Sequence, residues 1–212
     1  MNFNYNYILW DFDGVIINSD KARVFGFVKV LENYPKEHVD QLLEFHAQNG
    51  GLSRYVKFRY FFEEIRYETI SDEKLEELAQ SFSSIMRGTL TSKELLISDT
   101  CTFIKRNCSN MSMHIVSGSD GDELRFLIQQ LGFAGCFKSI QGSPVPKTKL
   151  VENLIQSGQV VKAQTCLIGD ARNDFDAATQ NGIDFYGYNN LELFHLGAGY
   201  IHSFSEVKVD LI

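Results

Sequence analysis

The sequence predicts an α/β protein in which helices cover both faces of a parallel sheet and a helical module is inserted after the first strand. Short apolar runs alternate with amphipathic helical patterns through most of the chain, which is typical of parallel sheets. Residues of about 20–90 break this alternation and contain only helical patterns. With 212 residues, of which 44% are hydrophobic, the chain can form one large domain, or one core with a modest second module.

Four apolar runs are expected to form the buried strands of the sheet. They cover residues 7–10, 113–116, 165–168 and 183–186. The first three are followed by a small or acidic residue, namely Asp11, Ser117 and Gly169-Asp170. These strand ends matter because ligands of open parallel sheets bind outside the carboxyl ends of the strands.

Three amphipathic helices are expected between these strands. The first has Ser119 as its expected N-cap and ends at Gly132, with leucines and an isoleucine at helical spacing between them. The second begins at Lys147, and the third runs from about Asp174 to Asn181. Crossover helices of this length favour a parallel sheet covered on both faces.

The inserted module is placed at residues 20–90, which leaves residues 1–19 and 91–212 for the sheet domain. Turn-forming residues at Pro35, Gly50-Gly51 and 69–71 divide it into helices. The expected helices cover roughly 19–34, 36–48, 53–67 and 71–87. Their aromatic residues at helical spacing are expected to form the core of the module.

Composition excludes several classes of function. The net charge of −7 and the lack of a long basic run argue against a nucleic-acid partner. The N-terminal residues lack the pattern of a signal peptide, and no apolar run is long enough to span a membrane. We therefore expect a cytoplasmic protein without a membrane partner.

The cysteines and histidines are assigned no chemistry. The four cysteines form no CxxC pair and have no histidines nearby at the spacing of zinc ligands, so they are expected to be free thiols. The five histidines are scattered along the chain. The cysteines are Cys101, Cys108, Cys136 and Cys166.

Acidic residues at the strand ends predict a metal site. Asp11, Asp13 and Asp170 should meet at one edge of the sheet, and three carboxylates there require a cation. Oxygen ligands without cysteine or histidine favour Mg²⁺. Lys147 would add a fixed positive charge beside the metal, and together they suit a substrate phosphate.

Four motifs in this order resemble the haloacid dehalogenase superfamily, in particular its phosphoglycolate phosphatase and beta-phosphoglucomutase-like subgroup. They are Asp11-Phe12-Asp13-Gly14 after the first strand, Ser117 in HIVSGS, Lys147 in SPVPKTKL, and Gly169-Asp170 through Asp174 in GDARND. The resemblance implies a Rossmann-like, three-layer core at 1–19 and 91–212 and an all-α cap domain at 20–90.

The resemblance also implies catalytic roles. Asp11 is then the nucleophile that forms an aspartyl-phosphate, and Asp13 is the general acid that later activates water. Lys147 neutralises Asp11 and the phosphoryl group. Ser117, the amide of Gly118 and Ser119 contact the transferring phosphate or the substrate. The implied Mg²⁺ site consists of Asp11, Asp13 (through its backbone carbonyl), Asp170 and, in support of Asp170, Asp174.

The segment NGGLSRYVKFRY at residues 49–60 resembles the cap loop of beta-phosphoglucomutase-like members. We expect Arg54, and with it Lys57, to contact an anionic or hydroxyl-rich part of the substrate. Two positions depart from the common family pattern. Val15 stands where threonine or serine is common, and Pro146-Lys147 replaces Lys-Pro, so Lys149 is a rival for the role of Lys147.

Each of these residues also has a purely structural interpretation. Ser117 and Asp174 could cap helices, and Lys147 could be a solvated residue of a first helical turn. Arg54 and Lys57 could form ion pairs within the cap. Asp176 is expected at the surface.

The function that these patterns favour is a Mg²⁺-dependent phosphatase acting on a small phosphorylated metabolite, such as a sugar phosphate or phosphoglycolate. The alternatives are a sugar-phosphate mutase and a catalytically idle binding or regulatory protein with the same fold. A dehalogenase and a phosphonate-cleaving enzyme are disfavoured because related members lack the second acid, here Asp13. The protein is expected to be a monomer or a homodimer.

Overall fold

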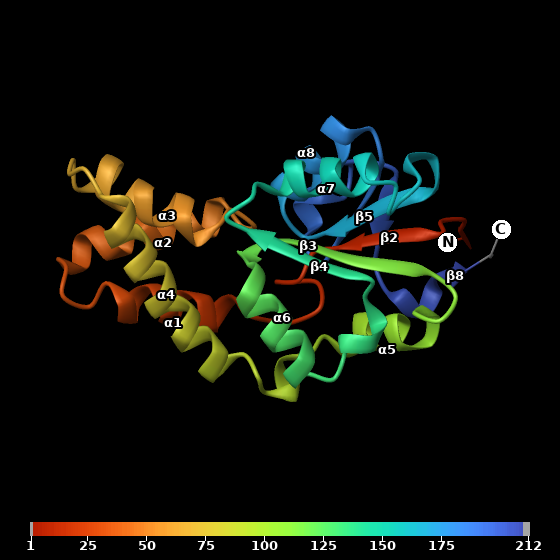
Figure 1. The fold of residues 1–212 in the computed structure, drawn as a ribbon, viewed down its shortest axis with the longest axis horizontal. Coiled ribbons are helices and arrows are strands. Elements are labelled where there is room, and N and C mark those ends of the chain that lie inside the picture. The colour runs from red at the N-terminus through yellow and green to blue at the C-terminus, as the bar shows by residue number, and fades with distance from the viewer. Residues whose placement is uncertain (1, 210–212) are drawn as a thin grey trace.

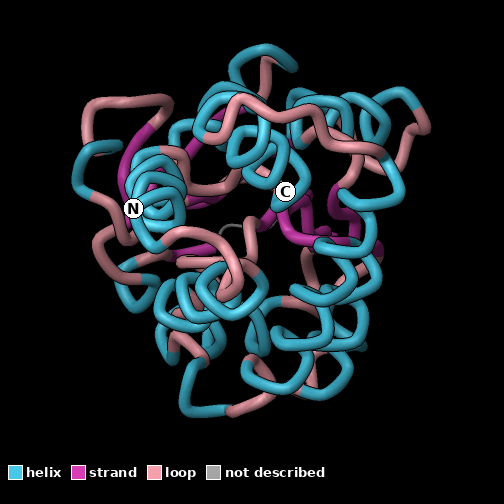
Figure 2. Tube along the Cα trace, turned by 90° about the vertical axis from the view of Figure 1, so that its left-hand side faces the viewer, coloured by secondary structure: helices cyan, strands magenta, loops and turns pink. Residues whose placement is uncertain are grey.

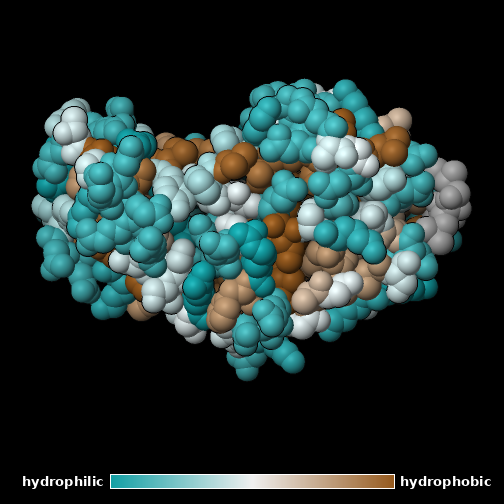
Figure 3. Space-filling view, viewed as in Figure 1, coloured by the Kyte–Doolittle hydropathy of each residue, from teal (hydrophilic) through white to brown (hydrophobic). Residues whose placement is uncertain are grey.

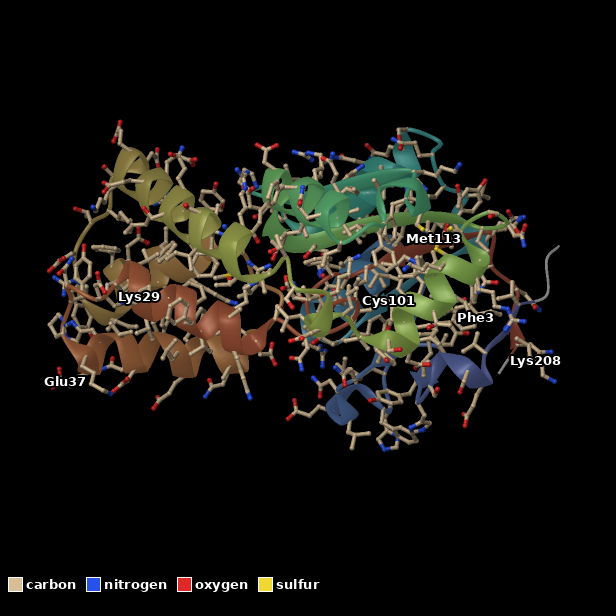
Figure 4. All side chains as sticks on the ribbon, turned by 90° about the horizontal axis from the view of Figure 1, so that it is seen from below. Phe3, Lys29, Glu37, Cys101, Met113 and Lys208 are labelled. Carbon is tan, nitrogen blue, oxygen red and sulfur yellow. The ribbon has the colours of Figure 1, made fainter. Side chains whose placement is uncertain are left out.

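The computed structural model describes residues 2–209, which form two lobes arranged along the longest axis of the molecule (Figure 1). The helical lobe comprises Asp20–Thr89, and the remaining described residues form the sheet lobe. The range of described residues both begins and ends at the far end of the sheet lobe, away from the helical lobe (Figure 1). In Figure 4, Lys29 and Glu37 lie in the helical lobe, and Phe3 and Lys208 lie at the opposite end.

The sheet lobe contains a six-stranded sheet in the order β4-β3-β2-β5-β6-β7, and every neighbouring pair is parallel. The central strand β2 pairs on both sides, with Trp10 opposite Ile115 and Ile168. A separate pair of short strands, β1 and β8, is also parallel. The strands are β1 Asn2–Phe3, β2 Tyr7–Trp10, β3 Ser112–Asp120, β4 Ser139–Ser143, β5 Thr165–Gly169, β6 Asp184–Tyr188, β7 Gly199–Ile201 and β8 Lys208–Val209.

Two layers of helices cover the two faces of the sheet. The side chains of β2 alternate between these faces, so each face has apolar side chains that a helix layer buries. Leu9 joins a cluster with α7 and α8, whereas Ile8 and Trp10 join the cluster that includes α5 and α6. Figure 1 shows these helix pairs on opposite sides of the sheet. The helices are α5 Ser98–Asn107, α6 Gly121–Gln130, α7 Lys147–Gln156 and α8 Arg172–Asn181.

The helical lobe is all-α within its described residues. Its elements are α1 Asp20–Val30, α2 Lys36–Gln48, α3 Arg54–Tyr60, a π-helical turn Phe61–Ile65 and α4 Asp72–Thr89. Aromatic rings form its centre, with the centroids of Phe27 and Phe82 4.6 Å apart and Phe58 beside them. Seen from this end, the helices lie in front of the strands (Figure 2). The face of the lobe in Figure 3 is mainly hydrophilic.

Short 3₁₀ turns complete the connections of the sheet lobe, at Lys93–Leu95, Ala134–Cys136, Lys162–Gln164, Leu191–Leu193 and Phe204–Glu206. All four cysteines are free thiols, as expected. None of the described helices is long and apolar enough to cross a membrane.

The α/β prediction with its parallel, three-layer core is confirmed, and all four expected strands are present. The sequence interpretation missed α5, β4, β7 and the β1–β8 pair. β4 reads SIQGS and β7 reads GYI, so neither has the apolar run by which the other strands were identified. The domain boundaries at 19/20 and 90/91 stay a prediction, and the helical lobe spans nearly the same residues.

One expected helix cap is wrong. Helix α6 begins after Asp120, whose side chain accepts a hydrogen bond from the Glu123 amide, and not after Ser119. Ser119 still belongs to β3, because that strand continues to Asp120. Its hydroxyl is therefore directed to other partners, which belong to the site described below.

Candidate active site

The predicted site residues converge on one cavity where the two lobes meet. The sheet lobe contributes the ends of β2, β3 and β5, and the helical lobe contributes α1, α2, α3, α4 and the loop before α3. The residues that line the cavity are Asp11, Asp13, Ser19, Asp20, Arg23, Phe27, His46, Gly50, Gly51, Leu52, Arg54, Lys57, Phe82, Ser117, Gly118, Ser119 and Asp170. Lys147 and Asp174 lie buried behind this lining.

Asp11 is buried and paired with a lysine. Its side chain is 2% exposed, and Lys147 Nζ lies 2.9 Å from its Oδ1. Lys147 also forms an ion pair with Asp174. Burial and the neighbouring charge of Asp174 raise the pKa of Asp11 to about 7, although Lys147 opposes this shift. Lys149, the rival lysine, is exposed and pairs with Glu152.

Asp11, Asp170 and Asp174 form an acidic cluster in which one oxygen of each residue lies within 4.8 Å of the others. Burial, followed by the charge of Asp11, raises the pKa of Asp170 well above its ordinary value. The donors are all carboxylate oxygens, which suits Mg²⁺, and a cation would relieve the repulsion between them. The residues present therefore fit a magnesium ion.

Gly14 allows the chain to pass close to this cluster. Its φ is +72°, and a Cβ at this position would lie 1.9 Å from Asp170 Oδ2. A side chain would therefore collide with the carboxylate and also strain the backbone. The glycine of the first motif is needed both for the turn and for the space beside Asp170.

Asp13 is held by three side chains. Ser119 Oγ donates to its Oδ2 at 2.5 Å, Arg23 Nε donates to its Oδ1 at 3.0 Å, and Ser19 Oγ donates to the same Oδ1. Burial alone would raise the pKa of Asp13, but Arg23 and the two hydroxyls outweigh it, so the pKa is lowered. Asp13 is therefore a carboxylate in this arrangement. Ser19 precedes α1 without capping it, because its hydroxyl is engaged by Asp13.

The end of β3 is in close contact with the loop before α3. Ser117 is 1% exposed, and its Oγ accepts a hydrogen bond from the Ser119 amide. A Cβ on Gly118 would lie 1.8 Å from the carbonyl oxygen of Gly51. Only a glycine at position 118 lets the two backbones come this close, so the two lobes are closed against each other here.

Arg54 and Lys57 both line the cavity and are 4% and 3% exposed. Arg54 is occupied by protein partners: its Nη2 lies 2.7 Å from Glu123 Oε2, and its Nη1 donates to Ser83 Oγ. Lys57 Nζ lies 2.8 Å from His46 Nδ1, and burial lowers the pKa of Lys57 to about 8. Among the described residues, no carboxylate lies within ion-pair distance of Lys57.

Sequence reasoning missed several residues of the site, chief among them Arg23, Glu123, Ser19 and His46. Arg23 lies in a helix predicted for the inserted module, and Glu123 lies in the first turn of a core helix, where acidic residues are common. Neither position forms part of a motif. Arg23 and Glu123 form an ion pair only because the two lobes dock. Such a contact leaves no pattern in the local sequence around either residue.

The family model described as haloacid dehalogenase-like hydrolase matches residues 8–188 of this chain. Comparison with curated proteins finds no significant match. The matched range contains all the motif residues and the entire helical lobe.

Solved structures with the same fold cover nearly the whole chain. A beta-phosphoglucomutase from Clostridium difficile has a TM-score of 0.76 at 15% identity, covering 96% of this chain and 93% of its own. CbbY from Rhodobacter sphaeroides, solved as a variant in complex with xylulose-1,5-bisphosphate, has a TM-score of 0.75 at 14% identity, covering 97% of both chains. YfnB from Bacillus subtilis, solved bound to magnesium, has a TM-score of 0.70 at 16% identity, covering 96% of both.

The parallel sheet, the inserted helices and the acidic cluster at the strand ends agree with the family match, which spans most of the chain. This chain therefore belongs to the haloacid dehalogenase-like hydrolases.

Proposed function

We propose that the protein is a Mg²⁺-dependent phosphatase that hydrolyses a small phosphorylated metabolite through an aspartyl-phosphate on Asp11. The observation that carries the proposal is the pairing of Asp11 with Lys147 inside the acidic cluster, on the floor of a cavity. A nucleophilic carboxylate can approach a phosphate only if nearby positive charge offsets their repulsion. Lys147 supplies one such charge, 2.9 Å from Asp11 Oδ1.

Magnesium would be held by Asp11, Asp170 and the backbone carbonyl of Asp13, with Asp174 supporting the site. When bound, it would supply positive charge to the phosphoryl oxygens. Asp174 is suited to support, because it pairs with Lys147 and accepts a hydrogen bond from the Ala171 amide at 3.0 Å. It thereby fixes both the lysine and the turn that carries Asp170.

The reaction divides between the two carboxylates of the first motif. Asp11 attacks phosphorus. Asp13, a carboxylate in the arrangement described above, takes up a proton when the charged phosphate binds and gives it to the departing oxygen of the metabolite. Asp13 is then a carboxylate, the form that Arg23 and the two serine hydroxyls stabilise, and it takes a proton from the water that hydrolyses the aspartyl-phosphate. Ser117 and the Gly118 amide contact the phosphoryl oxygens.

The helical lobe acts as a cap that closes over the phosphate and excludes water. The contact between Gly51 and Gly118 supports this role. Arg54 and Lys57 contact the part of the metabolite that is released as an alcohol when the phosphate is removed. Lys57 is the better suited of the two, because Arg54 already pairs with Glu123.

The test is phosphate release from p-nitrophenyl phosphate and from a panel of sugar phosphates and phosphorylated acids. We expect release with Mg²⁺, none with EDTA, and none from Asp11→Asn. Asp176→Asn is the matched control, because Asp176 pairs with Arg172 at the surface and should behave as the wild type. Equal and negligible turnover in all samples would instead favour a binding or regulatory protein.

The same panel separates hydrolysis from phosphoryl transfer within a sugar. Isomer formation without phosphate release would support a mutase and contradict the phosphatase. Arg54→Ala and Lys57→Met should change the order of preference among the substrates. Unchanged preference in both variants would show that these residues do not contact the metabolite.

A further inference from the structure

Glu123 is a fully buried carboxylate that joins the two lobes. It lies in the first turn of α6, in the sheet lobe, and is 0% exposed. Its Oε1 accepts a hydrogen bond from Arg23 Nη1 at 2.6 Å, and its Oε2 lies 2.7 Å from Arg54 Nη2. Both arginines belong to the helical lobe, so one carboxylate of the sheet lobe holds two of its cations.

The two arginines extend this contact into the cavity and into the helical lobe. Arg23, on α1, also donates to Asp13 and, at 2.9 Å, to the hydroxyl of Ser119. Arg54, on α3, donates to Ser83 of α4, and its guanidinium carbon lies 4.6 Å from the centre of the Phe82 ring. Glu123 is therefore linked to α1 and α3 directly and to α4 through Arg54.

The charges in this group balance only when the lobes are closed. Asp13 and Glu123 carry two negative charges, and Arg23 and Arg54 carry two positive charges, in the order Asp13–Arg23–Glu123–Arg54. All four side chains are largely buried, so removing one partner leaves an uncompensated charge in a poorly solvated place. Separation of the lobes would break the pairs of Glu123 with both arginines.

We propose that Glu123 is a positioning residue that latches the helical lobe onto the sheet lobe and holds Arg23 against Asp13. The effect on turnover rests on the proposed phosphatase function, whereas the effect on lobe closure does not. Glu123 itself does not line the cavity, so it acts through the arginines that do.

Glu123→Gln keeps the shape of the side chain and removes its charge. We expect kcat to fall by about tenfold or more, because misplaced catalytic groups lose rate, and KM to change by much less. The matched control is Asp122→Asn, the preceding residue of α6, whose exposed carboxylate pairs with Arg125. Asp122→Asn should keep the kcat of the wild type. A change in KM alone, or an equal loss of kcat in both variants, would overturn the proposal.

Lobe closure is measured without substrate, by small-angle X-ray scattering. The radius of gyration should increase in Glu123→Gln and in Arg54→Gln, and it should stay at the wild-type value in Asp122→Asn. Arg54→Gln leaves the Glu123–Arg23 pair intact, so it tests the latch even if Glu123→Gln fails to fold. The double variant Glu123→Gln/Arg54→Gln should expand no more than the more affected single variant, since Glu123→Gln already removes the charged partner of Arg54.

Unchanged scattering in both Glu123→Gln and Arg54→Gln would refute the latch whatever the activity of the protein. Absence of phosphatase activity in the wild type, with expansion of both variants, would refute the proposed function and leave the latch standing. Expansions that add up in the double variant would show that the two residues hold the lobes independently, and this would contradict the latch.

Discussion

Lys147 Nζ lies 2.9 Å from Asp11 Oδ1, with both side chains almost entirely enclosed by protein. The same lysine is paired with Asp174, so one cation faces two carboxylates. This relationship links the end of β2 to the first turns of α7 and α8.

Replacing Lys147 with methionine should remove the positive charge that Asp11 needs for attack on phosphate. We expect Lys147→Met to lower kcat by about 10²–10³-fold, comparable with the loss of one group that stabilises a transition state. The thermal midpoint should fall as well, because two buried carboxylates lose their partner. Lys149→Met is the control, since Lys149 is exposed. A larger loss of kcat in Lys149→Met would reassign the catalytic lysine.

Replacing Gly14 with alanine should destabilise the protein and weaken metal binding together. The new Cβ would overlap Asp170 Oδ2, and a positive φ in a residue other than glycine costs roughly 1–3 kcal/mol. Urea unfolding measures the loss of stability, and calorimetric titration with Mg²⁺ measures binding. Gly88→Ala in α4, where nothing lies near the new Cβ, should instead stabilise by about 0.5–1 kcal/mol. Unaltered Mg²⁺ affinity in Gly14→Ala would contradict the placement of the metal beside Asp170.

Adding Mg²⁺ to chelator-treated protein should raise its thermal midpoint, because binding to the native state stabilises it by about 2.7 kcal/mol at a hundredfold excess over Kd. Asp170→Asn should abolish this shift. Asp122→Asn, which replaces an exposed carboxylate on α6, should retain the shift in thermal midpoint. A shift that survives in Asp170→Asn would indicate that the ion binds elsewhere.

Acidification should destabilise the protein partly through His46. Burial, followed by the charge of Lys57, lowers the pKa of His46 to about 3, while its ordinary value is 6.5. The unfolded state therefore binds more protons between these two values, and the stabilisation present above pH 6.5 is lost progressively as the pH falls toward 3. Thermal midpoints between pH 7 and pH 4 should fall less steeply in His46→Gln than in the wild type. Parallel pH profiles would show that His46 does not titrate in this way.

Sequence patterns were informative where structure is set locally. Apolar runs identified β2 and β5, because a buried strand needs a continuous apolar segment, and the acidic residues after them marked the edge of the sheet. The sequence leaves Lys149 as a rival of Lys147, whereas in the structure Lys147 is buried against Asp11 and Lys149 is exposed. β4 and β7 could not be predicted from apolar runs. They are strands because they pair with β3 and β6, and their own sequences are not strongly hydrophobic.

The α/β architecture, the helical insertion and the acidic strand ends of the candidate site follow from the sequence alone, because periodicity and strand-end chemistry are properties of short segments. Three features became evident only from the folded structure. Arg23 and Arg54 share the carboxylate of Glu123, Ser119 binds Asp13 and does not cap α6, and Lys57 lies without a carboxylate partner among the described residues. These arrangements arise when two lobes dock and bury charges that are distant in the chain. The free energy of such pairs depends on distance and desolvation in the folded state, which no local pattern encodes.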